Sequence, residues 1–268
     1  MTVAWGYTEN VEERKMKISV IGAGNIGSTL ARSLARAGHT VTLANSRGPE
    51  TIQKLADDLG VAAAAAADAV KQAEVIVLSI PFAAMPTLAD VLRMAPPSAI
   101  IVDMSNNYPS GSGIEDGADG STSDSGWVSQ KLGRPVIKAW NSIFSRSLAL
   151  KGRPRGEPDR IALPVAGDDE ACKRVVMQLV EDTGFDAIDA GDLSASWRMQ
   201  PGSPAYCTDL DAATLRRALA SADRSRLPED RYAQVSRVYK PNAGAEGAGA
   251  VDMVNGPQLY REVTPIRE

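Results

Sequence analysis

The fold is decided by the stretch MKISVIGAGNIG, which spans residues 16–27. Its first half, Met16 to Ile21, is a short run rich in β-branched residues, which is typical of a buried parallel strand. Three glycines follow, and apolar residues then recur at helical spacing from Ile26 to Ala35, before Gly38 ends the pattern. The stretch therefore predicts a strand, a tight turn and a helix.

Each glycine of the turn has its own predicted role. Gly22 allows the tight turn, Gly24 lets the backbone approach a diphosphate, and Gly27 lets the helix close up on the strand. The amides of Asn25 and Ile26, at the positive end of the helix dipole, would bind the phosphates. A G-x-G-x-x-G motif in this context predicts a Rossmann-type dinucleotide-binding domain.

Strand and helix patterns alternate along the rest of the chain. We expect strands at 41–44, 74–80, 99–103, 135–140, 161–166 and 185–189, a weak strand within 62–67, and helices at 51–59, 170–181 and 210–222. Such alternation requires right-handed crossovers and a parallel sheet. The predicted fold class is α/β, with a Rossmann-type, doubly wound, mostly parallel sheet of about eight strands that includes the second half of the chain.

We divide the chain into three parts. Residues 1–15 form an N-terminal extension, and we hypothesise that translation starts at Met16. Residues 16–200 form the dinucleotide-binding domain, in which the Gly- and Ser-rich segment 106–123 is a long loop at the ligand edge. Residues 201–268 form a C-terminal helix and a Gly-, Ala- and Pro-rich tail. The tail either stays mobile or contacts a homodimer partner, and we favour the dimer contact.

The composition argues against several classes of protein. The 268 residues carry a net charge of -4 with both signs mixed, so nucleic acid is not an expected partner. No apolar run approaches the ~20 residues of a membrane helix and no signal peptide is visible, so we expect a cytoplasmic protein without a membrane partner.

Cys172 and Cys207 lack metal-ligand spacing, so no metal is expected. His39 falls at the end of the sheet opposite the ligand crevice and is expected to be structural.

The end of the second strand indicates which dinucleotide binds. The segment there is Asn45-Ser46-Arg47, without the carboxylate that would accept the ribose 2′-hydroxyl of NAD. Ser46 offers a hydroxyl, and Arg47 offers a fork of donors suited to phosphate oxygens. We therefore predict NADPH as the cofactor, against the alternative that Arg47 is simply a solvated arginine.

Three further segments leave the sheet at the carboxyl ends of strands, where ligands lie in open α/β folds. They are Ser79-Ile80-Pro81-Phe82, Asp103-Met104-Ser105-Asn106-Asn107 and Trp140-Asn141-Ser142. We expect these segments to border the nicotinamide. The amides of Asn106 and Asn141 can both donate and accept, which suits a carboxamide or a ribose, although asparagine near a turn is often only a turn former.

With these motifs the chain resembles the NADPH-dependent reductases of the deazaflavin coenzyme F420, and the similar cytosolic domain of six-transmembrane metalloreductases. The resemblance runs from Lys17 to Ser196, and its most discriminating part pairs residues 165–170 with residues 189–193. It implies that Ser46 and Arg47 hold the 2′-phosphate. It also implies that Asn141 and Ser142 lie where the nicotinamide meets a second, flavin-like ring.

The resemblance leaves the electron acceptor open. Some deazaflavin reductases carry histidine where this chain has Asn141, and the tail after Pro201 is an addition. The metalloreductases need a membrane haem domain that this sequence lacks, so metal reduction is not carried over.

The sequence thus predicts an NADPH-dependent oxidoreductase that transfers a hydride between NADP(H) and a small-molecule acceptor, either flavin-like or a deazaflavin. Asn141 and Ser142 would position the reactants, and no acid or base is assigned. One alternative is a dehydrogenase or imine reductase in which Lys138 donates a proton, although a structural or surface role for Lys138 is favoured. Another is a non-enzymatic NADPH sensor, because fold does not fix function.

Overall fold

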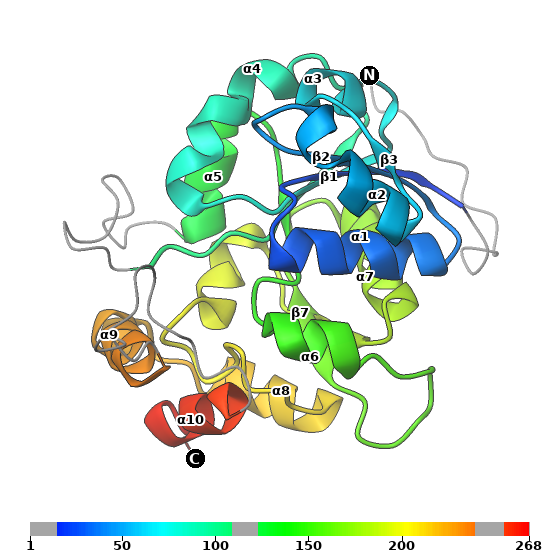
Figure 1. The fold of residues 1–268 in the computed structure, drawn as a ribbon. Coiled ribbons are helices and arrows are strands. Elements are labelled where there is room, and N and C mark those ends of the chain that lie inside the picture. The colour runs from blue at the N-terminus through cyan, green and yellow to red at the C-terminus, as the bar shows by residue number, and fades with distance from the viewer. Residues whose placement is uncertain (1–14, 109–122, 239–254, 268) are drawn as a thin grey trace, which may run out of the picture.

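The computed structural model describes residues 15–108, 123–238 and 255–267 (Figure 1). The predicted N-terminal extension lies almost wholly outside the described residues, as does most of the loop 106–123. Within the described part, no helix is long and apolar enough to cross a membrane.

The larger sheet has six parallel strands in the order β3-β2-β1-β4-β5-β6. These are β1 (Lys17–Ile21), β2 (Thr40–Ala44), β3 (Ala62–Ala63), β4 (Val75–Leu78), β5 (Ile100–Asp103) and β6 (Ile137–Lys138). Ile21, at the end of β1, pairs with Ala44 of β2 on one side and with Leu78 of β4 on the other. The carboxyl ends of the central strands therefore lie level along one edge of the sheet. The predicted α/β fold class and the parallel Rossmann arrangement are confirmed.

The second half of the chain does not extend this sheet as predicted. Strands β7 (Ala162–Val165) and β8 (Asp186–Asp189) form a separate two-stranded parallel sheet, so the eight strands are divided between two sheets. β6 has only two residues, and Trp140, which follows it closely, adopts a left-handed conformation with φ of 53°. Within the described residues, one isolated antiparallel bridge, between Lys138 and Ala166, joins the two sheets.

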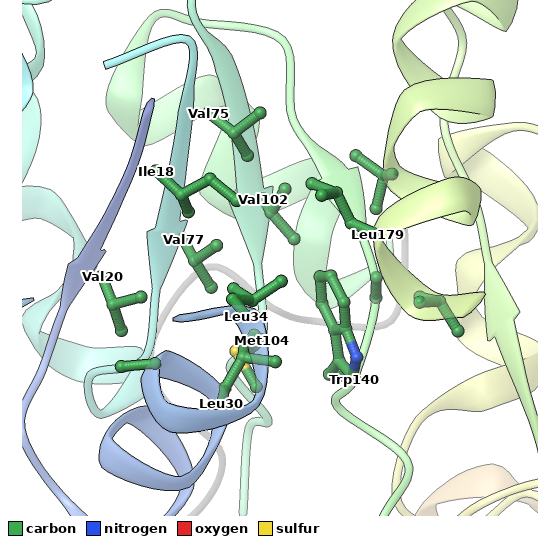
Figure 2. Close-up of a cluster of buried hydrophobic side chains, with 14 of the residues drawn as sticks. Ile18, Val20, Leu30, Leu34, Val75, Val77, Val102, Met104, Trp140 and Leu179 are labelled. Carbon is green, nitrogen blue, oxygen red and sulfur yellow. The ribbon is translucent and has the colours of Figure 1, made fainter. Parts of the chain in front are cut away.

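Helices cover both faces of the larger sheet. Alternate residues of β1, Ile18 and Val20, point to the face covered by α1 (Asn25–Arg36) and α7 (Glu170–Asp182). Figure 2 shows this cluster, in which Leu30 and Leu34 of α1 and Leu179 of α7 gather over the strands. Two further helices pack on α1. They are α2 (Gln53–Leu59) and α6 (Ser145–Leu150).

The opposite face packs a second cluster, which includes Ile76 and Leu78 of β4. Its helices are α3 (Ala66–Ala69), α4 (Ala89–Leu92) and α5 (Asp124–Leu132), with the 3-10 helices η2 (Val70–Gln72), η3 (Phe82–Leu88) and η4 (Leu193–Met199). The remaining 3-10 helices are η1 (Pro49–Thr51) and η5 (Arg224–Arg226). Sequence reasoning did not predict α5, whose first turn is capped by the Ser123 hydroxyl and which ends at Gly133 with φ of 63°.

The C-terminal segment folds back on the rest of the chain. Helix α8 (Ala212–Ala220) packs its buried residues on β7 and β8, and α9 (Leu227–Val238) and α10 (Gly256–Val263) lie side by side in Figure 1. Tyr260 of α10 is 2% exposed and stacks on Phe144. The described end of the tail is therefore neither free nor wholly extended. Its contact with a dimer partner and the domain boundary at residue 200 stay predictions.

Candidate functional site

A cavity of about 590 Å³ opens at the carboxyl ends of β1, β4 and β5. It is lined by residues from four segments: Gly24, Asn25 and Ile26; Ser79, Ile80, Pro81, Phe82 and Ala83; Met104, Ser105, Asn106, Asn107 and Tyr108; and Ser145. Sequence reasoning selected the first three segments as parts of one site. The structure brings them together, because the strands they follow are neighbours in the sheet.

The glycine turn has the shape that a dinucleotide requires. Gly22 has φ of 119°, and a Cβ there would lie 2.0 Å from the carbonyl oxygen of Ser79. A Cβ on Gly27 would lie 2.0 Å from the Gly22 carbonyl oxygen, so the helix can sit this close to the turn only without a side chain. A Cβ on Gly24 would meet nothing within 4 Å, since this residue faces open space. The backbone of Gly24 is thus the part of the turn that a ligand can reach.

The start of α1 can hold an anion. Gly24 is its N-cap and brings no side chain to the first amides, and the first turn has no acidic residue. The hydroxyls of Ser28 and Thr29 donate to the backbone carbonyls of Gly24 and Asn25, so they do not compete for those amides. Unshielded N–H groups at the positive end of a helix dipole fit a diphosphate.

The segment after β2 lies on the surface and outside the lining of the cavity. The Asn45 side chain accepts a hydrogen bond from the Arg47 amide at 3.1 Å and donates to the Thr51 hydroxyl at 2.8 Å. Ser46 and Arg47 are exposed at the tip of this turn. Asn45 therefore shapes the turn, while the hydroxyl and the guanidinium at its tip are accessible to a ligand. Their binding of a 2′-phosphate stays a prediction.

Asn141 lies behind Asn106 and does not line the cavity. Its side-chain nitrogen Nδ2 donates to Asn106 Oδ1 at 3.0 Å and to the Met199 carbonyl at 2.7 Å. The Asn106 nitrogen donates in turn to the Asn141 carbonyl at 2.9 Å and to the Tyr206 hydroxyl at 3.2 Å. Both N–H groups of Asn106 are thus used within the protein, and only its oxygen has capacity left for a ligand.

Ser142 is also buried, at 4% exposure, and its hydroxyl is outside the cavity lining. Neither this hydroxyl nor Asn141 Oδ1 has a hydrogen-bond partner. The Ser142 carbonyl accepts from the amide of Cys207 at 3.0 Å. The structure therefore places the two predicted positioning residues behind the wall of the cavity, where Asn141 can act on a ligand through Asn106.

Lys138 lies in a closed polar network beneath the cavity. Its side chain and that of Asp103 are both 0% exposed, and the Lys138 ammonium lies 3.3 Å from Asp103 Oδ2 and 2.8 Å from the carbonyl of Ser105. The hydroxyls of Ser105 and Ser125 also donate to the Asp103 carboxylate. Lys138 is structural in this arrangement.

Sequence reasoning missed two tyrosines at the site. Tyr108 lines the cavity, and its hydroxyl is hydrogen-bonded to that of Tyr206, which is 2% exposed. Burial raises the pKa of the Tyr206 hydroxyl well above its ordinary value, so this group is neutral. Tyr206 lies 100 residues beyond Asn106 in the chain. No sequence pattern could have indicated that contact.

His39 has structural contacts at the opposite end of the sheet. Its Nδ1 accepts from the backbone amide of Met16 at 3.3 Å, and its Nε2 lies 3.2 Å from Asp182.

Cys172 is half-buried on α7, and burial together with the Asp169 carboxylate raises the pKa of its thiol to about 11. Across the residues that the structure describes, no group of three or more His, Cys, Asp or Glu could hold a metal ion.

Residues 17–107, which form the glycine turn and most of the cavity wall, match the model of the family "NADP oxidoreductase coenzyme F420-dependent". Residues 17–107 therefore form a domain of this family. The family is one of NADP oxidoreductases, so the predicted resemblance is confirmed for this domain.

Two solved structures resemble a larger part of the chain. A hypothetical protein from Sinorhizobium meliloti is 30% identical, with a TM-score of 0.63 over 73% of this chain and 95% of its own. A protein from Arthrobacter sp. FB24, named as a candidate F420-dependent NADP reductase, is 27% identical, with a TM-score of 0.56 over 68% of this chain and 87% of its own.

One curated relative, protein YjhV of Escherichia coli (strain K12), is 48% identical over 99 residues. That match covers 35% of this chain and 65% of the relative. A 3-hydroxyisobutyrate dehydrogenase of Mycobacterium tuberculosis shares the fold at 22% identity, with a TM-score of 0.51 over 67% of this chain and 55% of its own.

Proposed function

We propose that this protein is an NADPH-dependent oxidoreductase that transfers a hydride between NADP(H) and a flavin-like or deazaflavin acceptor in the cavity at the carboxyl ends of β1, β4 and β5. The observation that carries the proposal is the continuity of the cavity wall. It begins at the open backbone of Gly24 and runs past Ser79–Ala83 to Met104–Tyr108. A dinucleotide bound at the first of these segments extends its nicotinamide toward the last.

The chain offers a binding group for each part of NADP(H). The amides of Gly24 to Ile26 would hold the diphosphate, and Ser46 and Arg47 would hold the 2′-phosphate. Ser79, Ile80 and Pro81 would border the nicotinamide, since they line the cavity beyond the diphosphate site. Bound NADPH would supply the hydride.

The remaining residues of the site fit a reaction that depends on alignment. The described lining of the cavity has no His, Lys, Asp or Glu side chain, and its polar groups are hydroxyls and amides. Hydride transfer between two stacked rings depends on close, aligned approach and exclusion of water more than on a strong acid. Asn141 would contribute by fixing Asn106 in the wall, with Ser142 next to it.

The alternative of an imine reductase or dehydrogenase with Lys138 as proton donor is disfavoured. The Lys138 ammonium is sealed from the cavity and paired with a carboxylate, so a substrate could reach it only if the network around Asp103 opened. A sensor that binds NADPH without turnover stays an alternative, since the same phosphate-binding groups would serve it.

Stopped-flow mixing tests the proposal. Protein loaded with NADPH is mixed with FMN, FAD, riboflavin or the deazaflavin under anaerobic conditions, and absorbance at 340 nm is followed. We expect rapid oxidation of NADPH with one of these acceptors. NADPH that binds tightly but is oxidised by none of them would instead support the sensor. Light scattering coupled to size exclusion would test the proposed homodimer.

A further inference from the structure

The side-chain amide of Asn107 has no hydrogen-bond partner. Asn107 lines the cavity, is 1% exposed, and is fixed by its backbone amide, which donates to Asp124 Oδ2 at 3.3 Å. Neither its Nδ2 nor its Oδ1 meets a partner. Its neighbour Asn106, in contrast, uses both N–H groups within the protein.

An unpaired amide in a buried position requires an explanation. Folding removes the group from water without replacing the lost hydrogen bonds, and for this reason nearly all buried polar groups in proteins are paired. The other buried side-chain atoms without partners belong to Trp127, Asn141, Ser142, Ser196, Ser203 and Asp209, which do not line the cavity. Among the described residues, Asn107 is thus the one that both lines the cavity and carries buried side-chain polar atoms without a partner.

We propose that Asn107 is a specificity residue, and that its amide pairs with a ligand edge that carries a carbonyl next to an N–H. An asparagine side chain presents an acceptor beside a donor, so its natural complement is a carboxamide or a cyclic imide. Two such edges are relevant to the proposed function, on which this inference rests. One is the carboxamide of nicotinamide, and the other is the imide edge of a flavin or deazaflavin.

Because the Asn107 side chain has no partner within the protein, its substitution should weaken ligand binding without lowering the melting temperature. Asn107→Leu keeps a similar volume and removes two unpaired polar atoms, so the ligand-free protein should melt at the same temperature as wild type or higher. The same variant should bind the recognised ligand at least tenfold more weakly. A residue with a purely structural role would lower the melting temperature instead. Asn107→Ala is a second variant that introduces no new bulk, and Gln258→Leu, which changes an exposed amide on α10, is the control.

Two pairs of ligands, which differ within each pair at one amide or imide group, distinguish the nicotinamide edge from the flavin edge. We would measure the dissociation constant of NADP⁺ against that of its 3-acetylpyridine analogue, which lacks the amide N–H, and the KM of riboflavin against that of N3-methylriboflavin, which lacks the imide N–H. Wild type should discriminate within one of these pairs by tenfold or more. The ligand pair that wild type discriminates identifies whether Asn107 recognises the nicotinamide carboxamide or the flavin imide. Asn107→Leu should lose the discrimination, while Gln258→Leu should keep it.

The outcomes separate this inference from the proposed function. If wild type binds NADP⁺ and turns over an acceptor, and Asn107→Leu matches it in every affinity and KM, the role of Asn107 is overturned and the proposed function stands. If wild type binds no NADP⁺, the proposed function itself fails.

Discussion

The ammonium of Lys138 lies 3.3 Å from the carboxylate of Asp103, and neither side chain is exposed to water. The pair joins β5 to β6 directly beneath the wall of the cavity. A buried ion pair of this kind adds little net stability, but removal of one partner leaves an uncompensated charge in the interior.

Lys138→Met should therefore destabilise the protein by about 3–5 kcal/mol, which urea unfolding would measure. Asp103→Asn in the same chain should recover part of this loss, because no charge is then left unpaired. Turnover per folded molecule should stay close to wild type in the double variant. A double variant that is well folded yet inactive would instead show that the pair takes part in turnover and is not only structural.

Arg47→Ala should weaken NADPH binding by about 1.5–3 kcal/mol, the range of a charge-assisted hydrogen bond, and leave NADH binding nearly unchanged. Isothermal titration with both cofactors measures this. Arg216→Ala is the matched control, because Arg216 is an exposed arginine on α8, a helix that does not contribute to the cavity. Equal losses for NADPH and NADH would contradict the assignment of the 2′-phosphate to Arg47.

Two glycine variants should separate binding from folding. Gly24→Ala places its Cβ in open space, so the melting temperature should hold while NADPH affinity falls by about tenfold or more, about 1.4 kcal/mol or more, because the methyl group blocks approach to the backbone. Gly27→Ala places its Cβ 2.0 Å from the Gly22 carbonyl, so the protein itself should be destabilised. Thermal unfolding without ligand, followed by NADPH titration, checks both. Identical behaviour of the two variants would reject the separate roles.

The thiol of Cys172 should react slowly with iodoacetamide at neutral pH. Its pKa of about 11 means that the thiolate, which is the reactive form, is rare at pH 8 and becomes about tenfold more abundant with each pH unit up to that value. Mass spectrometry of samples quenched at intervals measures the rate, with urea-unfolded protein as the control. A rate at pH 8 equal to that of the unfolded chain would contradict the raised pKa.

Tyr260→Ala should release α10 from the body of the protein. Its ring lies 5.3 Å from that of Phe144 and 5.6 Å from that of Tyr206, centre to centre. Loss of a buried aromatic ring costs about 3–5 kcal/mol, although local opening of a terminal helix would limit the effect on global unfolding. Hydrogen exchange should show lost protection in α10 and unchanged protection in β1 and β4. Unchanged protection in α10 would show that its other contacts are enough to hold the helix on the body of the protein.

The parts of the fold that depend on local pattern could be predicted from the sequence. The strands of the larger sheet are short apolar runs, and the glycine turn between β1 and α1 has a fixed spacing, so both are visible in a few residues. Helix α5 was missed because Ser125, Gly126 and Ser129 interrupt its apolar pattern, although its Ser123 cap and closing Gly133 were available as signals.

The division into two sheets could not be predicted, because residue patterns indicate where strands lie and not which strands pair. The left-handed conformation of Trp140 after β6 was equally unexpected, since bulky side chains rarely adopt it. The hydrogen bonding of Asn106 could not be predicted either. Its side-chain amide was expected to be able to donate to a ligand, but both of its N–H groups are used within the protein. Their acceptors are Asn141 and Tyr206, which lie 35 and 100 residues away. Sequence identifies the residues at the ends of strands, while tertiary contacts decide which of their atoms are available.

The hydrogen bond from Asn106 to Tyr206 also bears on how this scaffold could be re-engineered. Tyr206 lies outside residues 17–107, so the far end of the cavity is supported by a part of the chain that the family domain does not include. A chimera that moves only the strand-end loops of this chain into another reductase would leave Asn106 without its support. Exchange of acceptor preference between family members should therefore require the C-terminal segment to be transplanted together with residues 106–108.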